Sequence, residues 1–177
     1  MERSFSRTPQ AVEGAINSLR RISDSGDQPT AVRALWALYA LGARDEKDLI
    51  HTLSSTHEFV RAWAVRFLCE ERMATPEPLR RYALLARGDK SPLVRLSLAA
   101  ALQRLKPEQR WDVLTELVQH TEDADDHNLP LMYWYAAEAC VASDPDRALE
   151  LLKVCKIPKV REFIARRLAA ISFTSAK

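Results

Sequence analysis

The densest group of potential metal ligands in the sequence is the acidic segment 120–128, HTEDADDHN. Within it, Asp123, Asp125 and His127 have the early spacing of a calcium-binding loop. The turn glycine of such a loop is missing, and Trp134 stands where the bidentate glutamate should be. The two histidines with a carboxylate could instead hold zinc if the segment folded back. We favour a third interpretation, an exposed acidic turn that precedes a helix. The sequence therefore predicts no metal site and no cofactor, and whether the loop from Glu122 to Asp126 binds a cation stays open.

Potential nucleophiles give no stronger indication of chemistry. Cys69, Cys140 and Cys155 are an odd set without a close pair, so neither C-x-x-C nor the haem-attachment motif C-x-x-C-H is present. Cys69 and Cys140 lie in apolar helical surroundings, which is typical of buried free thiols. The sequence contains no recognisable nucleophile–base pair, glycine-rich phosphate loop or H-E-x-x-H motif. We therefore predict no catalytic residues and no enzyme activity.

Composition favours a helical protein. The 177 residues are 47% hydrophobic but include only four glycines, too few for the many tight turns of an all-β fold. A net charge of +2 does not by itself indicate nucleic acid or an anionic membrane as partner. No apolar run is long enough to span a membrane, and the first ten residues lack the apolar centre of a signal peptide. We expect a soluble chain without membrane insertion, and the compartment stays open.

Prolines and helical periodicity divide the chain into ten helices. All nine prolines fall at or within the first turn of an expected helix, where the missing N–H costs nothing. Ser91 and Pro92 are the clearest example, since Ser91 can cap the helix that Pro92 begins. The expected helices span residues 8–21, 28–42, 45–53, 57–71, 75–88, 91–105, 107–120, 128–141, 144–155 and 158–171.

Every second helix repeats one pattern, at spacings of 28 to 38 residues. The repeat begins with a mostly valine column: Val32, Val60, Val94, Met132 and Val160. Residues three, four and eight positions later are expected to point inward with it, which would place Tyr135 in the core. Five positions later stands a column of small residues that would let neighbouring helices approach closely: Ala37, Val65, Ala99, Ala137 and Ala165.

The residue after the first column is an arginine in four of the five repeats: Arg33, Arg61, Arg95 and Arg161, with Tyr133 in the fourth repeat. The Val-Arg pair and the length of the helix pairs resemble the HEAT repeat. This resemblance implies that each arginine pairs with an acidic residue of the preceding turn, a part that Asp27 and Asp89 could play. We accordingly expect one all-α domain over residues 1–177, a HEAT-like α-α superhelix of about five antiparallel helix pairs.

A narrower resemblance is carried by three segments: ALWALYALG at 34–42, VRAWAVR at 60–66 and NLPLMYWYAAE at 128–138. Together they are similar to the helical-repeat region of large exported haem-binding, membrane-bound-dehydrogenase-like proteins of planctomycete and verrucomicrobial type. In that family the redox chemistry belongs to a propeller and a C-x-x-C-H cytochrome segment, and this sequence has neither. The resemblance implies a connecting scaffold from a longer protein, whose parent would be exported to the periplasm.

Two functions remain open at this point. The favoured one is a non-catalytic scaffold that contacts a protein partner or neighbouring domains. Its candidate surface is the fourth repeat, where Tyr133 and Trp134 are expected either on a flank of the helix or, as we favour, packed against the neighbouring repeat or a missing domain, with Glu138 one turn beyond. The alternative is nucleic-acid binding on a concave face lined by Arg33, Arg61, Arg95 and Arg161, which the near balance of charge disfavours.

Overall fold

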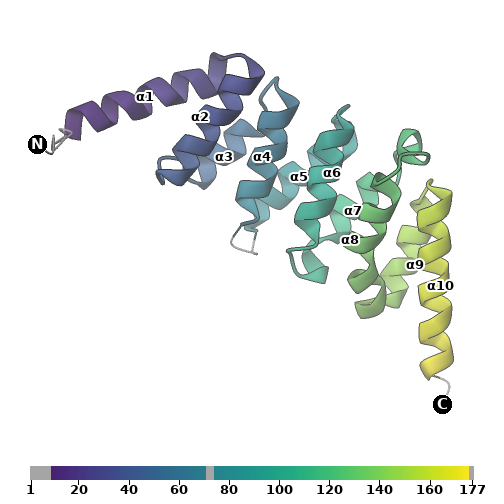
Figure 1. Ribbon diagram of the computed structural model, residues 1–177. Helices are drawn as coiled ribbons and strands as arrows, with labels where there is room; N and C mark the ends of the chain where they lie inside the picture. Colours follow the sequence, from purple (N-terminus) through teal and green to yellow (C-terminus); the bar gives the residue numbers. More distant parts are fainter. Residues whose placement is uncertain (1–8, 71–73, 176–177) are drawn as a thin grey trace, which may run out of the picture. The chain divides into compact units, whose positions relative to one another are not determined.

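The computed structural model describes residues 9–70 and 74–175, and across these residues the fold is all-α, as expected (Figure 1). The ten helices lie where the sequence predicts them, and most of their first and last residues differ from the expected ones by only a few positions. They are α1 (Pro9–Ser25), α2 (Gln28–Ala40), α3 (Glu46–Thr52), α4 (Glu58–Leu68), α5 (Pro76–Gly88), α6 (Pro92–Leu102), α7 (Trp111–Leu117), α8 (Leu129–Ser143), α9 (Pro145–Val154) and α10 (Pro158–Ser175). Two 3₁₀ turns, η1 (Pro107–Gln109) and η2 (Thr121–Asp123), precede α7 and α8.

Helices α2, α3, α6 and α9 begin where a short polar side chain accepts a free backbone N–H. The Asp27, Asp45 and Asp144 carboxylates accept the N–H three residues later, at 2.8–3.0 Å. The Ser91 hydroxyl accepts the Val94 N–H at 3.4 Å, as the sequence predicts. At the end of α2, Gly42 has a φ of 65°, a conformation that few other residues adopt without strain.

The chain forms two compact units, Met1–Ala64 and Val65–Lys177, and the boundary falls within α4. In the first unit α1 packs against α2. The buried side chains come mainly from α2 to α4 and include Leu35, Leu38, Leu49 and Val60. Helix α1 contributes little to this core, since Ser23 is its one fully buried residue.

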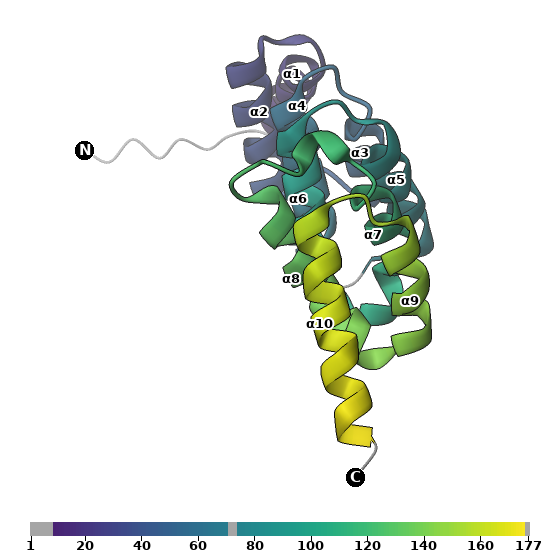
Figure 2. The ribbon, with the colours of Figure 1, turned by 90° about the vertical axis from the view of Figure 1, so that its right-hand side faces the viewer.

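The second unit contains two layers of helices. Helices α5, α7 and α9 pack on one another in turn, and so do α6, α8 and α10. Each helix also packs against its neighbour in the chain, which lies in the other layer. Figure 2 shows the last such pair, α9 and α10, nearest the viewer. The core between the layers is filled by large side chains that include Tyr82, Leu98, Leu114, Tyr133 and Ile164.

In the second unit, the small-residue column is buried on α6 and α8 but not on α10. Ala99 and Ala137 are fully buried, whereas Ala165 on α10 is exposed. The prediction that Tyr135 points inward is wrong, because 49% of its surface is exposed. The buried residues of α8 include Tyr133, Ala136, Ala137 and Cys140, so Ala136 and Cys140 point inward as expected, whereas Met132 of the valine column is half-buried. Positions at i, i+3, i+4 and i+7 share one helical face, so burial of Tyr133 with these residues turns Tyr135 outward.

Candidate functional site

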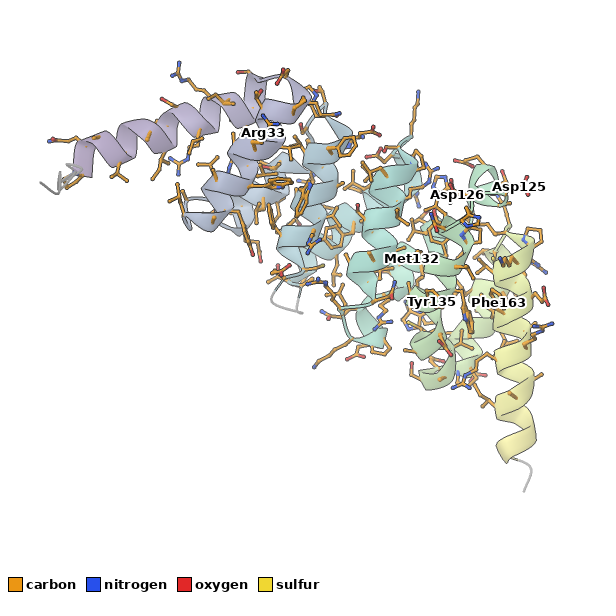
Figure 3. All side chains as sticks on the ribbon, viewed as in Figure 1. Arg33, Asp125, Asp126, Met132, Tyr135 and Phe163 are labelled. Carbon is orange, nitrogen blue, oxygen red and sulfur yellow. The ribbon has the colours of Figure 1, made fainter. Side chains whose placement is uncertain are left out.

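Three of the four repeated arginines close the turn that precedes their own helix. In each case Nη1 donates to the backbone carbonyl six residues earlier, at 2.9 Å: Arg61 to Ser55, Arg95 to Asp89 and Arg161 to Cys155. These carbonyls lie just before a helix, where no intrahelical donor reaches them. The repeated arginine therefore has a structural use within its own repeat. Arg33, by contrast, is exposed on α2 (Figure 3).

Arg95 also takes part in a buried ion pair that joins two successive helix pairs. Its Nε and Nη2 donate to the two carboxylate oxygens of Asp123 at 2.7 and 2.5 Å. The Tyr133 hydroxyl donates to the same carboxylate at 2.6 Å. Only 2% of the surface of Arg95 and of Asp123 is exposed, and none of Tyr133. Asp123 therefore holds α6 to α8 through the turn before α8.

This arrangement corrects two expectations from the sequence. The carboxylate partner of Arg95 is Asp123 in the following turn, whereas the Asp89 carboxylate of the preceding turn accepts the Ser91 N–H. Similarly, the Asp27 carboxylate accepts hydrogen bonds from Thr30. Of the two positions considered for it, Tyr133 occupies the contact between repeats and not the exposed flank of α8, since it is buried against Asp123 and cannot contribute to an exposed surface.

Burial and charge act together on the pKa values of this network. Burial alone lowers the pKa of the Arg95 guanidinium, but the hydrogen bond and negative charge of Asp123 outweigh it, so the pKa is raised. Burial, followed by the hydrogen bond to the Asp123 carboxylate, raises the pKa of the Tyr133 phenol. Arg95 thus stays charged and Tyr133 stays neutral at ordinary pH. The network is suited to holding helices together rather than to proton transfer.

The remaining polar groups of the acidic segment also hold its own turn. The two ring nitrogens of His120 lie 2.7 Å from a Glu122 carboxylate oxygen and 2.6 Å from the Ala86 carbonyl. The hydrogen bond with His120 lowers the pKa of Glu122. Asp126, labelled in Figure 3, accepts the N–H groups of Asn128 and Leu129, which lowers the pKa of Asp126. Among the described residues, no three histidine, cysteine or acidic side chains are arranged to hold a metal ion.

Arg110 is a buried cation that sequence reasoning missed. Its guanidinium donates to the carbonyls of Leu105 and Ala136, with the shortest distance 2.6 Å, and to that of Gln103 at 3.4 Å. It thereby joins the end of α6 to α8. Three backbone carbonyls thus surround this buried cation, and those of Gln103 and Leu105 follow the C-terminal end of α6, where carbonyls carry partial negative charge. An arginine before a buried Trp111 is the one sequence signal for this role.

The exposed side chains of the second unit that are best suited to a partner lie on α8. We define the α8 face as Met132, Tyr135 and Glu138 of α8 with Phe163 of α10. Tyr135 and Glu138 are exposed, and Met132 and Phe163 are half-buried. Figure 3 labels Met132, Tyr135 and Phe163. Trp134 is half-buried and packs against Phe163, with ring centroids 5.5 Å apart. Of the predicted surface residues Tyr133, Trp134 and Glu138, the structure therefore leaves Glu138 fully on the surface, and Tyr135 replaces Tyr133.

A groove of about 580 Å³ lies on the opposite layer of the second unit, between α5 and α7. Its apolar lining comes mainly from α5, where Leu84 is 60% exposed. Arg87 crosses the groove to Glu116 at 2.7 Å, and Gln109 donates to the Ala74 carbonyl. Its charged lining residues are thus paired with one another or with neighbours, so the groove offers an apolar surface without a distinct charge.

The first unit contains a smaller, more polar pocket and an aromatic pair. The pocket, of about 220 Å³, is lined mostly by hydroxyl-bearing residues between Ser23 and Thr56, together with Asp24 and His51. Trp36 and Trp63 meet edge to face with ring centroids 4.8 Å apart. In neither feature are a nucleophile, a general base and a group that stabilises an oxyanion arranged in a geometry that would support catalysis.

The three cysteines are buried and free, as expected. Burial raises the pKa of Cys69 and Cys155, and it raises the pKa of Cys140 to about 11. A thiol with such a pKa is a weak nucleophile at neutral pH, because little thiolate is present. Within the part of the chain that the structure describes, no helix combines the length and apolar character needed to cross a membrane.

We compared the chain with protein-family models, curated proteins and solved structures. None of them matches. The HEAT and dehydrogenase-like resemblances are therefore expectations drawn from packing residues alone. The function has to be argued from the geometry.

Proposed function

We propose that this protein is a non-catalytic helical-repeat scaffold that binds a protein partner, or neighbouring domains of a parent chain, through the α8 face. In this proposal the helices form about five antiparallel pairs, which stack into a HEAT-like superhelix. The observation that carries the proposal is Tyr135. It is a large aromatic side chain at a position of the repeat that was expected to be buried, and half of its surface is exposed.

The composition of the α8 face suits a protein surface. Tyrosine contributes a large, rigid contact area and a polar hydroxyl, and it is enriched among residues that dominate binding energy. Met132 supplies an adaptable apolar neighbour, and the Trp134–Phe163 contact fixes the wall between α8 and α10. Glu138 gives the face one exposed charge with which to orient a partner. The apolar centre with a polar edge is the usual arrangement of a protein interface.

Nucleic-acid binding, the alternative from the sequence, receives less support. That alternative needs exposed arginines that can reach phosphates. Arg95 is buried against Asp123, and the Nη1 atoms of Arg61 and Arg161 are bound to turn carbonyls. Of the four repeated arginines, Arg33 and Arg161 remain exposed, and Arg161 is held to its own turn.

The proposal is tested by affinity capture from the source cells with the tagged full chain and a Tyr135→Ser variant. We expect proteins that co-purify with the wild type to be reduced at least about tenfold with the variant, the effect of losing a dominant interface residue. The matched control is Leu84→Ser, which removes an exposed apolar side chain from α5 in the other layer. It should retain the partner at the level of the wild type.

Circular dichroism and urea unfolding establish that both variants are folded before capture. Equal loss of the partner in Tyr135→Ser and Leu84→Ser would contradict the α8 face as the binding surface. Equal recovery with wild type and Tyr135→Ser would contradict it as well.

A further inference from the structure

The outer flank of α10 is exposed at the positions that α6 and α8 bury. The repeated position is buried as Arg95 on α6 and as Tyr133 on α8, but Arg161 on α10 is exposed. The small-residue position behaves in the same way, since Ala99 and Ala137 are fully buried and Ala165 is exposed. The side of α10 that corresponds to a helix-packing side of α6 and α8 therefore faces solvent.

Helix α9 adds exposed apolar side chains next to this exposed side of α10. We define the end face as Leu149 and Leu152 of α9 with Arg161, Ala165 and Ala169 of α10. Leu149 is exposed and Leu152 is half-buried. Arg161 joins the two helices because its Nη1 donates to the Leu152 carbonyl at 2.8 Å. Figure 2 shows α9 and α10 in front of the other helices of the second unit. An exposed apolar face on a stack of helices favours association with another stack.

The charge on the end face indicates what would cover it. In Arg95, Nη1 closes the preceding turn while Nε and Nη2 bind Asp123 in the turn before the next helix. In Arg161, Nη1 closes the preceding turn in the same way. Its Nε and Nη2 have no carboxylate partner among the described residues. By continuity with the α6–α8 contact, the matching surface is a helix pair with a carboxylate in its connecting turn.

The chain itself carries such a helix pair in its first unit. Helix α1 has an apolar stripe that is only partly covered, and its Val12 and Ile22 are exposed. Two exposed carboxylates lie close before α2: Asp24 in the last turn of α1, paired with Arg44, and Asp27, which caps α2. Like Asp123 before α8, both precede the second helix of a pair. We define the α1–α2 edge as Val12, Ile22, Asp24 and Asp27. It offers an apolar surface to match that of the end face and a negative charge to pair with Arg161.

We propose that the end face of one molecule binds the α1–α2 edge of a second copy, so that the protein associates head to tail. Arg161 of one copy pairs with the Asp24–Asp27 turn of the next, and the exposed alanines of α10 allow α2 to approach closely. The inference goes beyond the proposed function, which concerns the α8 face. An interface of one helix pair is small, so we expect association in the range of tens of micromolar.

Sedimentation velocity of the purified full chain, from about 1 to about 300 µM, tests the proposal. We expect the weight-average sedimentation coefficient to rise across this range. Arg161→Glu should weaken the association at least about tenfold, since it places like charges together. The matched control is Lys159→Glu, the same change of charge on the same helix. Two positions correspond to about 200° around a helix, so Lys159 lies away from the end face.

A charge exchange gives the sharper test. Arg161→Glu mixed with Asp24→Arg should restore association between the two variants, while each alone stays dissociated. If Asp24→Arg unfolds the first unit, because Asp24 also pairs with Arg44 at 3.1 Å, Asp27→Arg takes its place in the same mixture. A sedimentation coefficient that does not change with concentration would overturn the proposal. So would association that survives Arg161→Glu, or equal weakening by Lys159→Glu.

Discussion

At the scale of single residues, one repeated position serves two purposes. An arginine there closes its own turn through a carbonyl six residues back, as Arg61, Arg95 and Arg161 all do. Arg95 has a second purpose, since its remaining donors bind Asp123 of the next turn. Tyr133 occupies the same position on α8, and its hydroxyl donates to the same Asp123 carboxylate that binds Arg95. The tyrosine that interrupts the arginine column thus completes a contact between repeats.

Removal of the Asp123 carboxylate should be strongly destabilising. Asp123→Ala leaves the buried Arg95 charge and the Tyr133 hydroxyl without their acceptor, which we expect to cost about 3–5 kcal/mol of unfolding free energy. Urea unfolding followed by circular dichroism measures this loss. The control is Asp125→Ala, an exposed aspartate two residues away, which should change stability by no more than about 0.5 kcal/mol. Similar values for the two variants would show that the buried pair is not what holds this turn.

The acidic segment should make stability depend on pH. The hydrogen bond with His120 holds the pKa of folded Glu122 below its usual value of 4.5, so the folded state binds fewer protons than the unfolded chain in this range. The resulting stability is present above that value and is lost as the pH falls through the folded pKa. Thermal unfolding between about pH 6 and about pH 3 should therefore show a shallower loss for Glu122→Gln than for the wild type. His120→Gln should flatten the profile in the same way. Parallel profiles for all three proteins would contradict this account of the turn.

At the scale of the elements, the beginnings of helices could be predicted closely and their inward faces less well. Proline and a capping side chain are local signals, so Ser91 and Pro92 place the start of α6 correctly. The inward face depends on what packs against the helix. The polar side chains of Arg95 and Tyr133 would favour exposed positions, but the buried carboxylate of Asp123 provides a partner for both. That partner comes from a distant turn, and the pattern within one helix does not contain it.

The small-residue column permits a direct test of helix packing. Ala99→Leu and Ala137→Leu each force three further carbon atoms between closely packed helices and should cost about 1–3 kcal/mol of unfolding free energy. Ala165→Leu makes the same change at the same repeat position on α10, where the side chain is exposed, and should cost less than about 0.5 kcal/mol. Urea unfolding in dilute solution compares the three variants. A large loss in Ala165→Leu, or none in the other two, would mean that the column does not mark the contacts between helices.

At the scale of the whole molecule, the sequence predicts the fold class but only part of the candidate site. Alternating helices with capped starts are sufficient to indicate an all-α fold. The proposed binding surface depends on which side chains the packing leaves exposed, and the sequence prediction had included Tyr133, which is buried, and not Tyr135, which is exposed. Two residues correspond to about 200° around a helix, so burial of Tyr133 turns Tyr135 toward solvent.

Nucleic-acid binding is a property of the whole charge distribution and is tested at that scale. We expect fluorescence anisotropy with a labelled DNA duplex to show at most weak binding to the full chain, because the net charge is +2 and Arg95 is paired in the core. Raising the salt concentration should accordingly change the measured affinity little. Tight binding at low salt with a steep fall as salt increases would favour the arginine-based alternative.

The central claim is that the exposed α8 face binds a protein partner. It is tested most directly by placing a photo-crosslinking phenylalanine analogue at Tyr135, and at Leu84 as the control, in the tagged full chain expressed in its source cells. The account predicts a discrete, higher-mass adduct with another protein after irradiation of the Tyr135 variant and none with the Leu84 variant. Adducts of equal yield from both positions, or adducts from Leu84 alone, would contradict it.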